Sequence, residues 1–189
     1  MGKTFLRILG VLLVAVALSP ATTIDFATTF GPEAPDATGS GTGFFKFNTT
    51  AQTLFIDVNW EGLSGVTTVA HIHCCVDPEG TVGVAVSPPS LPGFPVGVSE
   101  GTYTTTLDLT LESVFAAAFL TANGGTAAGA SAALLQGMLD GRAYFNIHSS
   151  TFRGGEIRDF LQPVPEPGTF AMAGLMMVGF LAWRRRKAL

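Results

Sequence analysis

A two-residue alternation of apolar and polar side chains is the feature that most restricts how this chain can fold. Between residues 53 and 60, Ile56, Val58 and Trp60 alternate with Asp57 and Asn59, as expected for a strand with one buried face. Comparable segments recur as far as residue 161, with turn residues between them. The pattern predicts seven strands, at residues 42–48, 53–60, 67–74, 81–86, 102–110, 142–148 and 156–161.

Two segments depart from this alternation. Apolar residues recur at helical spacing over residues 111–119 and 127–138, and Gly124-Gly125 separates the two stretches. Four prolines lie between residues 87 and 99 and predict a long surface loop, because proline cannot donate to a strand ladder. The prediction is therefore a mainly β domain, a sandwich or barrel carrying one or two short helices.

The N-terminal 21 residues have the pattern of a secretory signal peptide. Lys3 and Arg7 precede an apolar run over residues 8–18, and Ser19 and Ala21 supply the small residues that signal peptidase requires. As a helix the run would be roughly 16 Å long, about half the thickness of a bilayer's hydrocarbon core. Residues 1–21 are therefore predicted to direct export and to be cleaved after Ala21.

Residues 164–189 combine three unlike elements. An uncharged stretch, residues 169–183, predicts a membrane helix that tethers a precursor to the inner membrane, with the cations after it on the cytoplasmic side. A plain tail anchor is the alternative. The flanking residues are Pro165, Glu166 and Pro167 before the stretch and Arg184, Arg185, Arg186 and Lys187 after it. This order resembles a PEP-CTERM sorting signal, which implies cleavage by an exosortase and sorting to the surface or extracellular matrix of a Gram-negative bacterium.

The segment between the two ends, residues 22–163, is acidic. It holds four basic and thirteen acidic residues, a net charge of −9. Such a domain repels phosphate backbones, so nucleic acid is excluded as a partner. About 140 residues is the usual size of one domain with one hydrophobic core.

The two cysteines, Cys74 and Cys75, are neighbours in the sequence. Adjacent strand residues point to opposite faces, so a bond between them requires the strand to end or bend there. A turn predicted over residues 76–80 provides such a break. A vicinal disulfide is therefore favoured over intermolecular bonds, free thiols or metal ligation.

All three histidines lie in two predicted strands. His71 and His73 share one face of the first strand, and His148 shares a face of the later strand with Tyr144 and Asn146. If the two strands are neighbours, three imidazoles converge into a ligand set suited to copper or zinc. The alternative is a structural role, in which the rings bond nearby side chains. The available partners are Asn146, Ser149, Ser150, Asp77 and Glu79.

Three motifs in order carry a family resemblance: Ala-His-Ile-His at residues 70–73, Gly-Arg-Ala-Tyr-Phe-Asn-Ile-His-Ser at 141–149 and Gly-Gly-Glu-Ile-Arg at 154–158. The region from about residue 42 to 161 resembles a CHRD domain. The resemblance implies an immunoglobulin-like β fold distantly similar to copper/zinc superoxide dismutases, and it assigns no activity. Cys74-Cys75 stands where members often have Gly-Pro. A dismutase's metal pair uses six histidines, and this chain has three.

The function expected from these features is that of a non-enzymatic surface or matrix protein that binds exopolysaccharide or other surface proteins. The alternative is a metal-binding domain or metalloenzyme that uses His71, His73 and His148. No catalytic residue is assigned: Cys74 adjoins His73, but consecutive strand residues face apart, which is poor geometry for proton transfer between them. Glu156 and Arg158 are expected to form an exposed ion pair, either with each other or with a neighbour.

Overall fold

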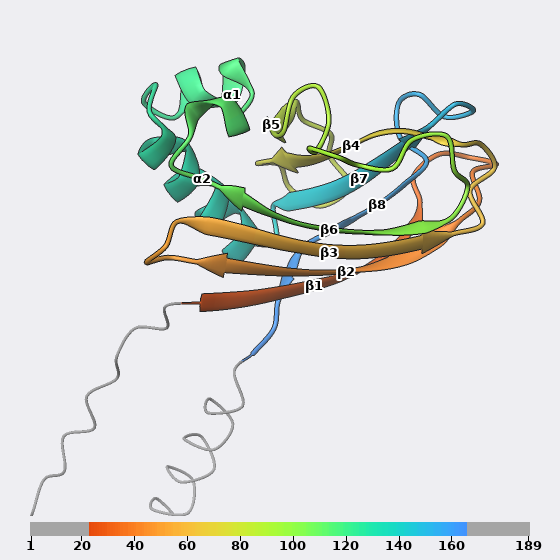
Figure 1. Ribbon diagram of the computed structural model, residues 1–189, viewed down its shortest axis with the longest axis horizontal. Coiled ribbons are helices and arrows are strands. Elements are labelled where there is room, and N and C mark those ends of the chain that lie inside the picture. The colour runs from red at the N-terminus through yellow and green to blue at the C-terminus, as the bar shows by residue number, and fades with distance from the viewer. Residues whose placement is uncertain (1–22, 166–189) are drawn as a thin grey trace, which may run out of the picture.

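The computed structural model describes residues 23–165 of the chain, and the predicted signal peptide and most of the sorting segment lie outside these residues. The described part contains nine strands and two short α-helices, one of them preceded by a single 3-10 turn (Figure 1). The strands are β1 (Thr23–Pro32), β2 (Ser40–Asn48), β3 (Thr53–Glu61), β4 (Thr67–Cys74), β5 (Val84–Val86), β6 (Gly101–Asp108), β7 (Ala143–Ser149), β8 (Ile157–Phe160) and β9 (Gln162–Pro163). The 3-10 turn is Glu112–Val114, and the helices are α1 (Ala117–Ala122) and α2 (Ala127–Leu139).

The strands form one curled antiparallel sheet in the order β5-β4-β7-β8-β1-β2-β3-β6, with β9 added beside β1. Strand β1 joins the two halves, because residues 23–30 pair with β2 whereas Gly31 and Pro32 pair with β8. Figure 1 shows the result as two layers, with β1, β2, β3 and β6 in one and β4, β7 and β8 in the other. This arrangement confirms the predicted mainly β, sandwich-or-barrel fold with one or two short helices; the structure has two.

Aromatic side chains fill the space between the layers. Phe145 of β7 lies 5.2 Å from the ring of Phe30 and 5.7 Å from the ring of Phe45, which belong to the opposite layer. All three side chains are essentially inaccessible to solvent. Burying each of these side chains stabilises the folded state by roughly 1.5–3 kcal/mol. This aromatic cluster is therefore one of the main packing contacts between the two layers.

Helices α1 and α2 lie together at one end of the sandwich (Figure 1). Thr126 caps the N-terminus of helix α2: its side-chain oxygen accepts a hydrogen bond from the Gly129 amide at 3.1 Å. Leu134 and Met138 are fully buried on its inner face. The helix therefore covers the apolar end of the core, as its periodicity predicted.

The predicted strands differ from the observed ones in three places. The structure contains a strand that the prediction omitted, β1, in which Phe26, Thr28 and Phe30 alternate inward like the residues of the other strands. The predicted strand at residues 81–86 is shortened to β5, which begins at Val84. A two-residue strand, β9, is too short to produce any periodicity.

The proline-rich segment at residues 87–99 is a loop, as predicted, but part of it is buried. Phe94 stacks on Trp60 with the ring centroids 5.1 Å apart, and the Tyr103 hydroxyl donates to the Pro92 carbonyl at 2.7 Å. The loop thus closes one side of the core as well as crossing the surface.

None of the helices within residues 23–165 is long and apolar enough to cross a bilayer. The membrane helix predicted at residues 169–183 lies outside the described part of the chain.

Candidate metal centre

Direct pairing of β4 with β7 brings the three histidines together. In the register, His71 faces Asn146, His73 faces Tyr144, and His148 faces Val69 one step further along. The ring of His71 lies 5.7 Å from the ring of His73 and 5.2 Å from that of His148. His71 and His73 are buried, and His148 is partly exposed, so the cluster opens to solvent on the His148 side.

Each imidazole is bonded to a backbone carbonyl from a different loop. His71 Nε2 lies 2.6 Å from the oxygen of Pro89, His73 Nδ1 2.8 Å from that of Val82, and His148 Nδ1 2.8 Å from that of Arg153. A carbonyl oxygen can only accept, so the ring nitrogen in each pair carries the proton. These three contacts fix the tautomer and the orientation of every ring.

The remaining ring nitrogens point toward one another. In the neutral rings, His71 Nδ1, His73 Nε2 and His148 Nε2 carry lone pairs, and one ligand atom from each residue lies within 4.8 Å of the others. His71 Nδ1 and His148 Nε2 are 3.3 Å apart. His73 Nε2 is buried without a hydrogen-bond partner among the described residues. Lone pairs this close repel unless a proton or a cation lies between them.

Burial keeps two of the rings neutral. Removal from water lowers the pKa of His73 to about 4, against the opposing hydrogen bond to Val82. It lowers the pKa of His71 as well, and the neighbouring His148 acts in the same direction. Protons therefore compete weakly for these two nitrogens at neutral pH, which is the state that a metal ligand requires.

A column of stacked groups supports His73 from one side. The Tyr144 ring lies parallel to the His73 ring with the centroids 4.6 Å apart, and the Arg158 guanidinium lies 4.8 Å from the centroid of Tyr144. Arg158 also bonds the Gly80 carbonyl at 3.1 Å and the Glu33 carboxylate at 3.3 Å. The column therefore ties β7 and β8 to the loop that holds His73.

Glu33 is the residue of this neighbourhood that the sequence interpretation missed. Its carboxylate accepts a short hydrogen bond from the Asn146 side chain and pairs with Arg158. Burial raises the pKa of Glu33, although the attraction of Arg158 opposes the rise. Gly155, with φ of +136°, leaves room for this carboxylate, because a Cβ there would overlap both Glu33 and Asn146. The alternation of inward and outward side chains along β1, which ends one residue before Glu33, was the sequence signal that could have placed this residue near the cluster.

The expectation of an exposed Glu156–Arg158 pair was wrong in part. Arg158 pairs with a neighbour, Glu33, but Glu156 is fully buried and accepts hydrogen bonds at 2.5 Å from both the amide and the hydroxyl of Ser64. Burial alone would raise the pKa of Glu156, but hydrogen bonds from Ser149 and Ser64 outweigh it and lower the pKa. Glu156 is therefore an internal anchor for the turn after β3.

The side-chain partners suggested for the histidines are also wrong. The three rings bond backbone carbonyls, whereas Asn146 donates to Glu33 and Asp77 pairs with Arg142 at 3.0 Å. The chain thus holds the imidazoles with loop backbone and leaves one nitrogen of each ring facing the cluster.

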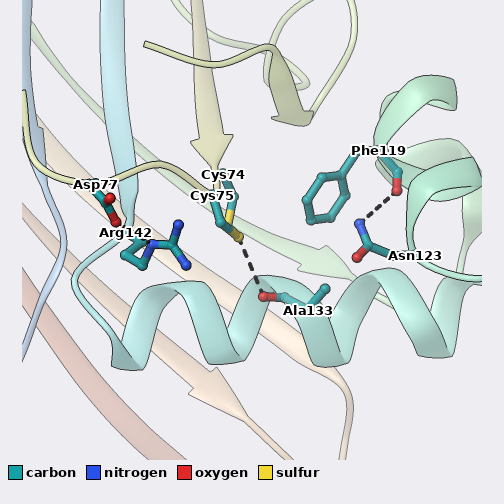
Figure 2. The surroundings of a disulfide bond; sticks show 7 residues. All are labelled: Cys74, Cys75, Asp77, Phe119, Asn123, Ala133 and Arg142. Atoms are coloured by element: carbon teal, nitrogen blue, oxygen red, sulfur yellow. Dashed lines mark hydrogen bonds and ion pairs between the residues drawn. A yellow bond between two sulfur atoms is a disulfide. The ribbon is translucent and has the colours of Figure 1, made fainter. Parts of the chain in front are cut away.

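Cys74 and Cys75 are joined to each other in the structure at the end of β4 (Figure 2). Cys74 is buried and Cys75 is partly exposed. The pair lies against helix α2, where Cys75 Sγ is 3.7 Å from the Ala133 carbonyl oxygen. Cys74 points away from the face that carries His71 and His73, so the sulfur pair and the histidine cluster are separate features.

The fold and the cluster define an antiparallel β-sandwich domain with three histidines on two adjacent strands. The chain belongs to the CHRD family, since the CHRD domain model matches residues 15–161. Residues 163–187 match the PEP-CTERM protein-sorting motif. The protein is therefore exported and sorted by an exosortase-type system, as in Gram-negative bacteria. Comparisons with curated proteins and with solved structures gave no match.

Proposed function

We propose that this exported CHRD domain is a non-enzymatic metal-binding module of the bacterial surface, which holds one copper or zinc ion through His71, His73 and His148. The observation that carries the proposal is that three backbone carbonyls accept from one nitrogen of each ring, while one ligand atom from each histidine lies within 4.8 Å of the others. A ligating histidine characteristically donates its other ring nitrogen to such an acceptor.

The distances fit a first-row metal after small side-chain rotations. Two imidazole nitrogens that bind one tetrahedral zinc at about 2.0–2.1 Å lie about 3.4 Å apart. The separation of His71 Nδ1 from His148 Nε2, 3.3 Å, already meets this requirement. The third nitrogen lies within 4.8 Å of the others and needs to move inward. Three imidazoles with one open position suit copper or zinc better than calcium or magnesium, which prefer oxygen ligands.

Metal loading provides the test. The full-length chain, solubilised in a mild detergent, is stripped with a chelator, incubated with copper or zinc, dialysed, and measured by elemental analysis. We expect about one equivalent of metal in the parent protein and almost none in His73→Ala or His148→Ala, because each loses one of three protein ligands. Asn59→Ala, an exposed polar change on the outer face of β3, is the matched control and should load like the parent.

Two outcomes would contradict the proposal. The first is a parent protein that retains no metal and melts at the same temperature with and without excess zinc. A ligand that binds the native state should raise the melting temperature. The second is equal loading of the parent and both histidine variants. In either case the histidines would have a structural role. The binding of exopolysaccharide or surface proteins would then be the function to test next.

Sorting is tested separately on the C-terminal signal. We propose that the tail tethers a precursor to the inner membrane until an exosortase releases it. Replacing Glu166 and Pro167 with alanine should leave a slower-migrating precursor in the membrane fraction, visible by immunoblotting. The control carries Thr169→Ala and Ala171→Ser, two changes that leave the Pro-Glu-Pro tripeptide intact. Normal maturation of the Glu166 and Pro167 variant would rule out processing through this motif.

A further inference from the structure

The Cys74–Cys75 pair packs so tightly against helix α2 that no further atom fits between them. Where the pair meets helix α2, the helix has a glycine, Gly137, and a Cβ built there would overlap the sulfur atoms of both cysteines. The carbonyl of Ala133, one turn earlier, lies beside Cys75 Sγ (Figure 2). The helix backbone is therefore packed directly on the bonded sulfur pair.

The same place joins three parts of the fold. The Arg142 amide donates to the Gly137 carbonyl at 2.7 Å, and the Val76 amide donates to the Arg142 carbonyl at 3.0 Å. Asp77 and Arg142 form an ion pair across this junction, also visible in Figure 2. The end of α2, the start of β7 and the loop after Cys75 thus meet at the sulfur pair.

We propose that Cys74 and Cys75 form a redox-sensitive latch that holds helix α2 against the sandwich when oxidised and releases it when a dithiol reduces the bond. Two thiols cannot remain as close together as two bonded sulfurs. The space beside Gly137 cannot absorb the separation, because it does not admit even one further carbon. Reduction therefore displaces either the helix or Cys75, and the contact between them is lost in both cases.

The reaction is an ordinary thiol–disulfide exchange. A thiolate of the dithiol attacks Sγ of Cys75, the more exposed of the two residues, and Cys74 leaves as a thiolate that takes up a proton. The second thiol of the reductant then attacks the mixed disulfide and frees Cys75. In sum, two electrons and two protons pass to the protein, and the dithiol becomes a disulfide. The latch requires no metal, so it stands apart from the function proposed above.

Hydrogen exchange of the full-length chain in detergent, measured by mass spectrometry before and after treatment with dithiothreitol, tests the latch. Alkylation without reductant should add no groups, and alkylation after reduction should add two. On reduction, amides of residues 127–139 should exchange at least about tenfold faster, while those of β2 and β3 remain unchanged. Reoxidation should restore the slow exchange.

The double variant Cys74→Ser/Cys75→Ser is the matched control and should show fast helix exchange with or without reductant. If that variant does not fold, reversible reduction of the parent decides the question alone. Two alkyl groups added before any reduction would overturn the proposal. So would helix exchange that is identical in both redox states, or an acceleration spread equally over all strands.

Discussion

Replacing Phe145 with alanine should lower the free energy of unfolding by about 3–5 kcal/mol. The side chain is fully buried and contacts Phe30 and Phe45 of the opposite layer, so its removal leaves a cavity where the two layers meet. A loss of this size is a large part of the roughly 5–15 kcal/mol that stabilises a typical domain. Urea unfolding, followed by the fluorescence of the buried Trp60, measures it.

The matched control is Phe44→Ala. Phe44 precedes Phe45 on β2, points to the outer face and is only partly buried. Its removal leaves no internal cavity and should cost about 1 kcal/mol or less. Equal losses for the two variants would contradict the assignment of Phe145 as the contact between layers. If Phe145→Ala does not fold at all, Phe145→Leu should give a smaller, measurable loss in the same direction.

The sequence predicted the strands better than their arrangement. Alternation reveals a half-buried strand because it reflects one buried face, and it therefore located β3, β4 and β6 closely. The residues of a single strand do not determine which of the two layers that strand joins. The division into layers depends on β1, which leaves β2 at Phe30 and pairs with β8 at Gly31, a long-range choice set by packing.

The candidate site divides in the same way. The shared face of His71 and His73 follows from the two-residue period, but the approach of His148 required β4 and β7 to be neighbours. The groups that orient the rings are main-chain oxygens, and every residue has one. No side-chain pattern could therefore have identified Pro89, Val82 and Arg153 as the acceptors. Glu156 was misjudged for a related reason, because its partner Ser64 is 92 residues away.

The metal-free protein should lose about 3 kcal/mol of stability through His73 alone when the pH falls from 7 to 4. Burial lowers the pKa of His73 from 6.5 in the unfolded chain to about 4 in the folded one. Between these values the unfolded state binds a proton that the folded state does not bind, so stability rises with pH and is lost on acidification. Below about pH 4 both states are protonated at His73, and its contribution to the pH dependence ends.

The measurement is urea unfolding at several pH values from 7 to 4 in the presence of a chelator, compared with the same series for His73→Gln. The lowered pKa values of His71 and Glu156 also make the protein less stable in acid, but they act in both proteins. The difference between the two curves therefore isolates His73: between pH 6.5 and 4 the parent should lose stability more steeply than the variant, by about 1 kcal/mol per pH unit on average. Parallel curves would show that His73 titrates normally in the folded state. The ring would then be accessible to water, and the argument that its Nε2 is held neutral and ready to bind a metal would fail.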